Sequence, residues 1–169
     1  MNNIETYFSE LYGQYCWDVD WEGQLNLSMH FGEPRLSVRQ PISRNPGKRY
    51  VRAKGRWWLW VWLAYWKVSF PDGFAITSAS PTDRRARGLF RLEGQALTEV
   101  RVHEATGRTR LTFDLGAVLD IRRMSRKEAE DLWFLYRPRK YVLTVRGDGF
   151  YNHRRANKEE TRWNRIVDT

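Results

Sequence analysis

The sequence predicts an α+β fold that is mainly β, built from two tandem copies of one module. Three observations lead to this prediction. The segment Leu11-Tyr12-Gly13-Gln14 recurs 81 residues later as Leu92-Glu93-Gly94-Gln95. Alternating apolar residues follow each copy, as expected for strands with one buried face. Each copy also ends in an Asp-Gly-Phe turn, at residues 72–74 and 148–150.

Each copy is expected to contain a helix, a three-strand meander and a terminal hairpin. We assign residues 1–81 to the first β-rich module, 82–153 to the second and 154–169 to a polar tail. An element that is apolar on one face must bury that face against another layer. The two modules should therefore pair about a pseudo-twofold axis and share one barrel- or sandwich-like core.

The first copy begins with apolar residues at helical spacing between Ile4 and Leu11, and Gly13 ends the predicted helix. Strands are expected over 15–21, 24–31 and 35–40, with turn chemistry between them. The Pro- and Gly-containing residues 41–55 are typical of a mobile basic loop. The Trp-rich run 56–70 predicts a central strand covered on both faces, and residues 74–77 predict a further strand.

The second copy begins with a predicted Arg-rich helix over 82–92. Strands are expected over 96–103, 108–115 and 118–123. Ser125 and Glu128 have capping-box spacing, which predicts a short helix up to about Trp133. A hairpin over 141–146 and 150–153 should close the module, and a frayed tail should begin at Arg154.

Composition limits the class of protein. The chain has 169 residues, a formal net charge of +9 and one cysteine, so an intramolecular disulfide is excluded. No secretory signal is visible at the N-terminus. The longest apolar run, Trp57 to Trp66, is about half the length that a membrane-spanning helix needs. We therefore expect a soluble, cytoplasmic protein, bacterial in style, with no membrane partner.

No catalytic, metal-binding or cofactor-binding motif is evident. The three histidines are far apart in the sequence, which argues against a locally built metal site. Asp18, Asp20 and Glu22 alternate along one predicted strand, and this pattern indicates a solvated acidic face. Cys16 has no nearby histidine and should be a buried small residue. The prediction is a non-enzymatic protein with no cofactor.

Two features indicate a binding surface. The stretch Arg44 to Arg56 contains six basic residues and no acidic one, which favours a polyanion or an acidic protein surface. The Trp-rich run that follows should be mostly core, with its end residues the best candidates for exposed anchors. The candidate partner-binding residues are Arg44, Lys48, Arg49, Arg52, Arg56, Trp57, Trp66, Arg84 and Arg85.

The Leu-x-Gly-Gln segments, the Asp-Gly-Phe turns and the stretch Phe113–Leu119 resemble small bacterial single-domain proteins of the immunity type found in polymorphic toxin systems. The resemblance covers the two repeated meanders and brings over no active-site residue. It implies a cytosolic protein that occludes a protein partner. Immunity proteins against nucleases are often acidic, whereas this chain is basic, so the resemblance here favours a partner with an acidic surface.

Three functions therefore remain open. The leading hypothesis is a non-enzymatic, immunity-type binding protein. The alternative is a nucleic-acid-binding protein that uses the basic loop 44–56 and the Arg-rich helix 84–91. The third is an enzyme whose site assembles from distant residues such as His30, Asp114 and Arg122. The sequence specifies neither the partner nor the oligomeric state.

Overall fold

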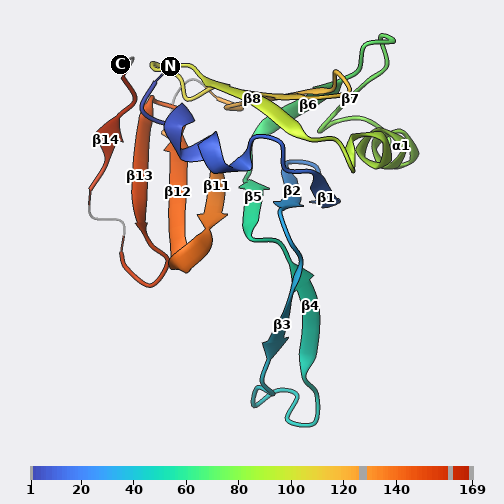
Figure 1. Ribbon diagram of the computed structural model, residues 1–169, viewed down its shortest axis with the longest axis vertical. Helices are drawn as coiled ribbons and strands as arrows, with labels where there is room; N and C mark the ends of the chain where they lie inside the picture. Colours follow the sequence, from blue (N-terminus) through green and yellow to red (C-terminus); the bar gives the residue numbers. More distant parts are fainter. Residues whose placement is uncertain (1, 126–128, 160–161, 168–169) are drawn as a thin grey trace.

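The computed structural model describes residues 2–125, 129–159 and 162–167. The fold is mainly β, as the sequence predicts (Figure 1). The described chain contains one α-helix, α1 (Thr82–Leu92), and two short 3-10 helices, η1 (Glu5–Leu11) and η2 (Pro138–Lys140). The predicted bounds of α1 are confirmed, and the first predicted helix is of the 3-10 type.

The larger sheet has seven antiparallel strands in the order β1-β2-β5-β11-β12-β13-β14. Their bounds are β1 (Cys16–Glu22), β2 (Asn26–Phe31), β5 (Trp57–Val61), β11 (Asp131–Arg137), β12 (Tyr141–Arg146), β13 (Phe150–Arg155) and β14 (Asn164–Arg165). The sheet therefore joins strands from both ends of the chain.

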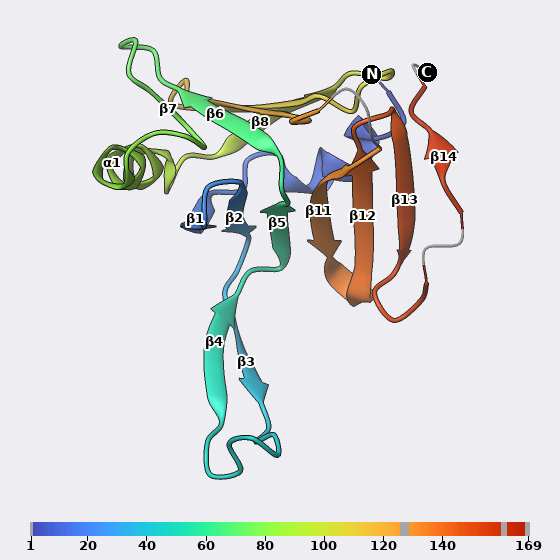
Figure 2. The ribbon, with the colours of Figure 1, turned by 180° about the vertical axis from the view of Figure 1, so that it is seen from behind.

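The second sheet has five strands in the order β7-β6-β10-β9-β8 and runs across one end of the larger sheet (Figures 1 and 2). Its strands are β6 (Tyr65–Ser69), β7 (Ala75–Thr77), β8 (Leu97–Val102), β9 (Thr109–Phe113) and β10 (Val118–Arg122). Helix α1 packs against β1 and β7. Apolar side chains of both sheets and of η1, including Phe8, Leu59, Trp66 and Leu111, meet in one buried core.

The Trp-rich run 56–70 forms two strands in different sheets, so the predicted single central strand is wrong. Trp57, Leu59 and Val61 face the core from β5, whereas Trp66 and Val68 do so from β6. The core-facing positions thus change from odd to even numbers. The change occurs around Leu63, whose positive φ of 47° interrupts the extended backbone.

The predicted meander of the second copy is confirmed, because β8, β9 and β10 are neighbours in that order. In the first copy β3 (Arg35–Arg39) does not join β2. It pairs with β4 (Tyr50–Lys54) in a separate two-stranded sheet, and β5 takes the place beside β2. The predicted mobile loop over 41–55 is wrong for residues 50–54, because β3 provides a partner for their backbone groups.

Each Leu-x-Gly-Gln segment bonds to the residue that begins the strand after the other segment. The N–H of Gly13 donates to the carbonyl of Leu97 at 2.8 Å, and the N–H of Gly94 donates to that of Cys16 at 2.8 Å. The Cys16 N–H donates to Gln95 and the Leu97 N–H donates to Gln14. Each bond has a counterpart displaced by 81 residues, and Tyr15 pairs with Ala96 between them. These contacts hold one end of β1 against one end of β8.

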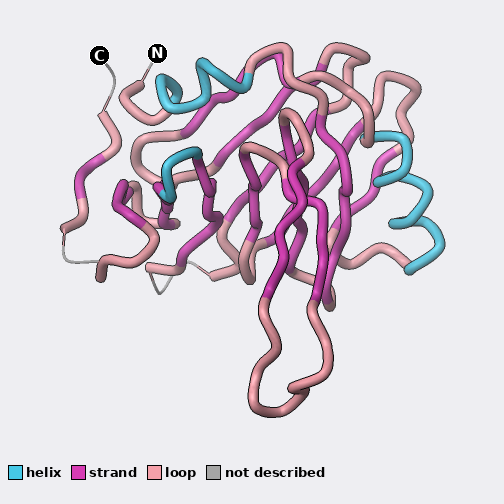
Figure 3. Tube along the Cα trace, turned by 60° about the horizontal axis from the view of Figure 1, so that its bottom comes forward, coloured by secondary structure: helices cyan, strands magenta, loops and turns pink. Residues whose placement is uncertain are grey.

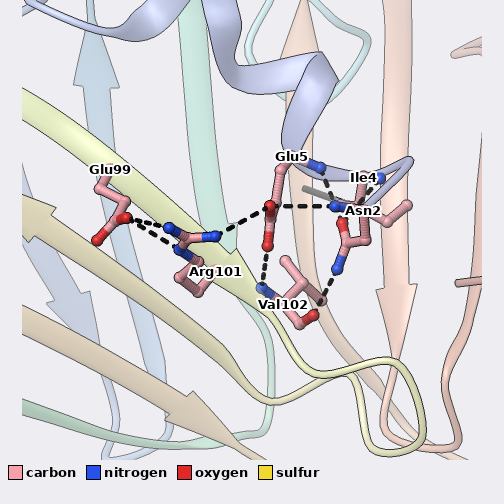
Figure 4. Close-up of polar contacts among 6 residues, drawn as sticks. All are labelled: Asn2, Ile4, Glu5, Glu99, Arg101 and Val102. Atoms are coloured by element: carbon pink, nitrogen blue, oxygen red, sulfur yellow. Dashed lines mark hydrogen bonds and ion pairs between the residues drawn. The ribbon is translucent and has the colours of Figure 1, made fainter. Parts of the chain in front are cut away.

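The N-terminal segment is fixed to β8 through a buried carboxylate (Figure 4). Glu5, 5% exposed, accepts hydrogen bonds from the backbone N–H groups of Asn2 at 3.1 Å and Val102 at 3.2 Å. The side chain of Asn2 accepts from the N–H groups of Ile4 and Glu5 and donates to the Val102 carbonyl. Arg101, which also pairs with Glu99, lies 3.9 Å from Glu5. Because both oxygens of the Glu5 carboxylate accept hydrogen bonds, the fold tolerates its burial.

Two predictions for the C-terminal part are corrected. The predicted capping box spans Ser125–Glu128, of which residues 126–128 lie outside the described residues. The predicted helix does not reach Trp133, because β11 begins at Asp131. Arg154 and Arg155 belong to β13, and Ile166 is buried at 3% exposure, so these parts of 154–169 are not frayed. The backbone of β14 pairs with β13. Among the described residues, no helix has the length and apolar character needed to cross a membrane.

Candidate functional site

The strands β3 and β4 form a ribbon that projects from the body of the molecule (Figures 1 and 3). We call residues 35–56 the arm. Five cross-strand pairs, from Arg35–Lys54 to Arg39–Tyr50, set its register. Its tip is ordered by local contacts: the side chain of Asn45 donates to the Tyr50 hydroxyl at 3.1 Å, and the guanidinium of Arg49 donates to Gln40 at 3.0 Å.

Alternation gives the arm two different faces. Successive side chains of a strand point to opposite sides, so Leu36, Val38, Val51 and Ala53 share one face. That face is exposed to solvent: Leu36 is 78% exposed, Val51 56% and Val38 50%. The other face has Arg35, Arg39, Arg52 and Lys54. The arm is therefore amphipathic, with an apolar and a basic side.

The arm contains nearly all of the protein's net charge. Its eight basic residues are accompanied by no Asp or Glu, and the rest of the chain has 21 basic and 20 acidic residues. In the part of the chain that the structure describes, no ion pair involves an arm side chain. The eight basic residues are Arg35, Arg39, Arg44, Lys48, Arg49, Arg52, Lys54 and Arg56.

The base of the arm is held closely against β2 and β5. A Cβ atom at Gly55 would lie 2.6 Å from the Phe31 carbonyl oxygen, so only glycine fits this approach. The Gly55 N–H donates to Nδ1 of His30 at 3.2 Å. His30 itself is only 8% exposed. It orients the arm at the point where the arm leaves the sheet.

An open cleft of about 730 Å³ lies where the arm meets the larger sheet. A smaller hollow of about 280 Å³, which shares Asp20, Ser28, Arg52 and Trp58 with the cleft, extends along the same sheet face. The cleft is lined by Trp17, Asp18, Asp20, Ser28, His30, Arg39, Arg52, Ala53, Lys54, Trp58 and Glu93.

Aromatic rings form the floor of the cleft. The register places Trp17 opposite His30, His30 opposite Trp58, and Trp58 opposite Tyr136. Their ring centroids are 5.0, 5.8 and 4.7 Å apart, with planes within 29° of parallel. Trp60 stacks on Trp58 at 5.5 Å. These rings lie on the side of the sheet away from the core and are only partly buried, apart from His30.

The neutral His30 ring is held in one tautomer. Because Nδ1 accepts the Gly55 N–H, the neutral ring has its proton on Nε2, which lies 3.8 Å from Asp18. Burial lowers the pKa of His30 below the ordinary 6.5, and Lys54 lowers it further, against the opposing effect of Asp18. His30 is thus a neutral part of the stack, with Nδ1 already engaged.

The cleft walls have opposite charges. Asp18 and Asp20 come from β1, where a bulge between Trp17 and Asp20 and a φ of 51° at Asp18 change the strand's direction. The wall opposite is formed by Arg39, Arg52 and Lys54 of the arm. In the described residues no ion pair links the two walls. Charges of both signs thus line the same cleft.

The sequence-predicted partner residues divide into three groups. Arg44, Lys48, Arg49, Arg52 and Arg56 all belong to the arm and are exposed. Trp57 and Trp66 are 4% and 0% exposed, so the expectation of exposed anchors is wrong for both. Each is on the core-facing side of its strand, and the guanidinium of Arg56 covers the Trp57 ring at 4.9 Å.

The third group, Arg84 and Arg85 of α1, has structural contacts. Arg85 is 7% exposed, donates to the carbonyls of Gly23 at 2.9 Å and Ser78 at 3.4 Å, and stacks on Trp21. Arg84 donates to the Ala75 carbonyl and lies over the Phe74 ring. Arg85 is therefore wrong as a surface candidate, because its cation is used inside the fold.

The residues of the distant-site enzyme hypothesis are not brought together. Asp114 accepts the backbone N–H of Ala96, and Arg122 lies over the Tyr65 ring in the other sheet. Neither lines the cleft that contains His30. Among the described residues, no group of three or more His, Cys, Asp or Glu could hold a metal ion. Cys16 is buried, as predicted, and burial raises the pKa of its thiol to about 12.

Sequence reasoning missed the aromatic floor. Trp58 and Trp60 belong to the run that is expected to be mostly core, yet together with Trp17 they lie on the open side of the sheet. Alternation along the strand is the sequence signal for this placement: Trp58 and Trp60 alternate with the aliphatic Leu59 and Val61, so the two pairs of residues lie on opposite faces. Comparison with protein-family models, curated proteins and solved structures finds no match for this chain.

Proposed function

We propose that this protein binds nucleic acid through the arm, with the two-stranded ribbon entering a groove of a duplex. The single observation that leads to this proposal is the concentration of eight unpaired basic side chains, without one carboxylate, on a projecting ribbon. The major groove of B-DNA is wide enough for a two-stranded β-ribbon. Basic side chains along both strands can reach the phosphates that border the groove.

The dimensions are compatible with a short binding site. A five-residue strand rises about 17 Å, and both strands of the arm have this length. Such a ribbon covers about five base pairs of duplex. The tip adds Arg44, Lys48 and Arg49 beyond the strands.

The proposal is tested by fluorescence anisotropy with a labelled duplex of about 20 base pairs, over a range of salt concentrations. Phosphate contacts release counterions, so log K should fall linearly with log salt at a slope of about −0.9 per contact. With the arm's eight cations available, we expect a slope between about −4 and −7. Absence of binding at 50 mM salt, or a slope near zero, would sink the proposal.

A second candidate function is an immunity-type interaction with an acidic protein partner, as the resemblance of the sequence to immunity-type proteins implies. The apolar face of the arm favours it, because Leu36, Ile42 and Val51 are each more than half exposed. Exposed apolar patches with a polar surround mark protein-binding sites. Pull-down with the wild-type chain and with Leu36→Asp/Val51→Asp distinguishes the candidates: loss of a captured acidic protein with duplex binding retained supports this one.

We also propose that the fold arose as two copies of one module. The reciprocal hydrogen bonds between Gly13–Cys16 and Gly94–Leu97 support this. Each first strand also has a bulge near its start, between Trp17 and Asp20 in β1 and between Leu97 and Glu99 in β8. On this interpretation the arm is an insertion in the first copy alone, as expected for a feature acquired for binding. We propose a cytoplasmic location for this protein, as its sequence predicts.

A further inference from the structure

We propose that the cleft at the base of the arm binds a single unpaired nucleotide, with a preference for guanine. This inference deepens the proposed function and rests on it in part. Three surfaces of the cleft differ in chemistry: an aromatic floor, an acidic wall and a basic wall. A nucleotide has a matching part for each, namely a planar base, the hydrogen-bond donors on its edge and a phosphate.

The floor suits a base because stacking on aromatic side chains is the general way in which proteins hold unpaired bases. Trp17 and Trp58 are partly exposed at the cleft and are fixed on either side of His30. The Trp17 indole N–H donates to the Gly32 carbonyl at 2.8 Å, which prevents this ring from turning. A prearranged platform reduces the entropy lost when a ligand binds.

The basic wall suits a phosphate. Arg52 lines both the cleft and the adjoining hollow, and the Lys54 ammonium lies 6.0 Å from the centre of the Trp58 ring. A nucleotide held in the cleft would therefore have two cations within reach of its phosphate. Neither cation is engaged with a carboxylate of a described residue.

The acidic wall supplies the base preference. Carboxylates only accept hydrogen bonds, and guanine alone among the common bases has two neighbouring donors, N1–H and the 2-amino group, on its Watson–Crick edge. Uracil has one donor between two acceptors, which a carboxylate repels. The Asp18 side chain is 62% exposed, and Asp20 is exposed beside it. The two carboxylates are thus accessible to an edge-on base.

The experiment is titration of the full ¹⁵N-labelled chain with GMP, IMP, UMP and guanosine, observed through the indole N–H resonances of Trp17 and Trp58. GMP should bind at least fivefold more tightly than IMP, which lacks the 2-amino group, and more tightly still than UMP. GMP should also exceed guanosine at low salt. Equal binding of GMP and UMP, or no shift at about 5 mM nucleotide, would overturn the inference.

Variants separate the site from the rest of the arm. Asp18→Asn/Asp20→Asn should abolish the GMP-over-IMP preference, and Asn tolerates the positive φ at position 18. Arg52→Gln should weaken GMP at least fivefold but leave guanosine unchanged. Asp83→Asn, on exposed α1, is the control and should change neither. Unchanged GMP selectivity in the Asp18/Asp20 variant would contradict the assignment.

Failure of this inference can be told apart from failure of the proposed function. Arg44→Gln/Lys48→Gln/Arg49→Gln alters the tip and leaves every cleft residue in place. If it loses duplex binding and keeps GMP binding, both proposals stand. If the wild-type chain binds GMP selectively but no duplex, the cleft assignment stands alone. If it binds duplex but no nucleotide, the cleft assignment fails and the arm proposal stands.

Discussion

The arm and helix α1 are both rich in basic residues, but their contacts differ: the α1 arginines contact carboxylates or backbone carbonyls, whereas no arm cation forms an ion pair with a described residue. In α1 the four arginines are engaged: Arg84 and Arg85 with backbone carbonyls, Arg87 with Asp83 at 3.6 Å and Arg91 with Asp72 at 2.9 Å. The arm has eight basic residues and no acidic partner among them. The number of basic residues does not distinguish the two regions. The carboxylates and carbonyl groups that lie near those residues do.

The largest effect on binding should follow removal of the arm. Because Arg35 and Lys54 are cross-strand partners, residues 36–53 can be replaced by Asn-Gly, a sequence suited to a two-residue hairpin turn. Duplex affinity should fall at least about 100-fold at about 150 mM salt, since five of the arm's eight basic residues are removed. The melting temperature should change little, because almost every residue removed is exposed. If the shortened protein keeps its duplex affinity, the binding surface lies outside the arm.

Arg85→Met should reduce stability and leave duplex affinity unchanged, which is the opposite of removing the arm. It removes a buried cation with two carbonyl partners, so we expect a loss of about 2–3 kcal/mol in the free energy of unfolding, measured by urea denaturation. Duplex affinity of the folded variant should stay within about twofold. A tenfold loss of affinity with normal stability would show that α1 belongs to the interface after all.

Gly55→Ala tests how the arm is seated. The new Cβ would lie 2.6 Å from the Phe31 carbonyl, so β2 or the arm must shift. We expect a destabilisation of about 1–3 kcal/mol by the same denaturation measurement. Gly47→Ala at the tip, where nothing lies within 4 Å, is the matched control and should be neutral. Equal stability of the two variants would contradict the close approach at the arm's base.

Lowering the pH should modestly reduce the free energy of unfolding, in part through His30 at the base of the arm. The folded-state pKa values of His30 and His153 lie below the ordinary 6.5, mainly through burial. The folded chain therefore binds fewer protons than the unfolded chain, and stability should fall as pH drops below 6.5. Each histidine contributes at most about 1.4 kcal/mol per pH unit. His30→Asn, which keeps an acceptor for Gly55, should reduce this slope between pH 7 and 5; an unchanged slope would contradict the assignment.

The sequence predicts local elements well where a short pattern determines them. The bounds of α1 and the meander of β8, β9 and β10 depend on apolar spacing within the segment itself. Residues 41–55 are predicted to be a loop because Tyr50–Lys54 becomes a strand only through its pairing with Arg35–Arg39. Trp58 and Trp66 have similar sequence surroundings, yet one lines a cleft and the other is fully buried. That difference depends on which layer covers each face, which no local pattern contains.

The central claim is that the free charges of the arm, and not those of α1, contact nucleic acid. The most direct measurement compares the salt dependence of duplex binding for Arg44→Gln/Lys48→Gln/Arg49→Gln with that for Arg84→Gln/Arg87→Gln/Arg91→Gln. Both variants lose three positive charges. The arm variant should reduce the steepness of log K against log salt by about 2.7, and the α1 variant by less than about 0.5. Equal reductions in both would contradict the account.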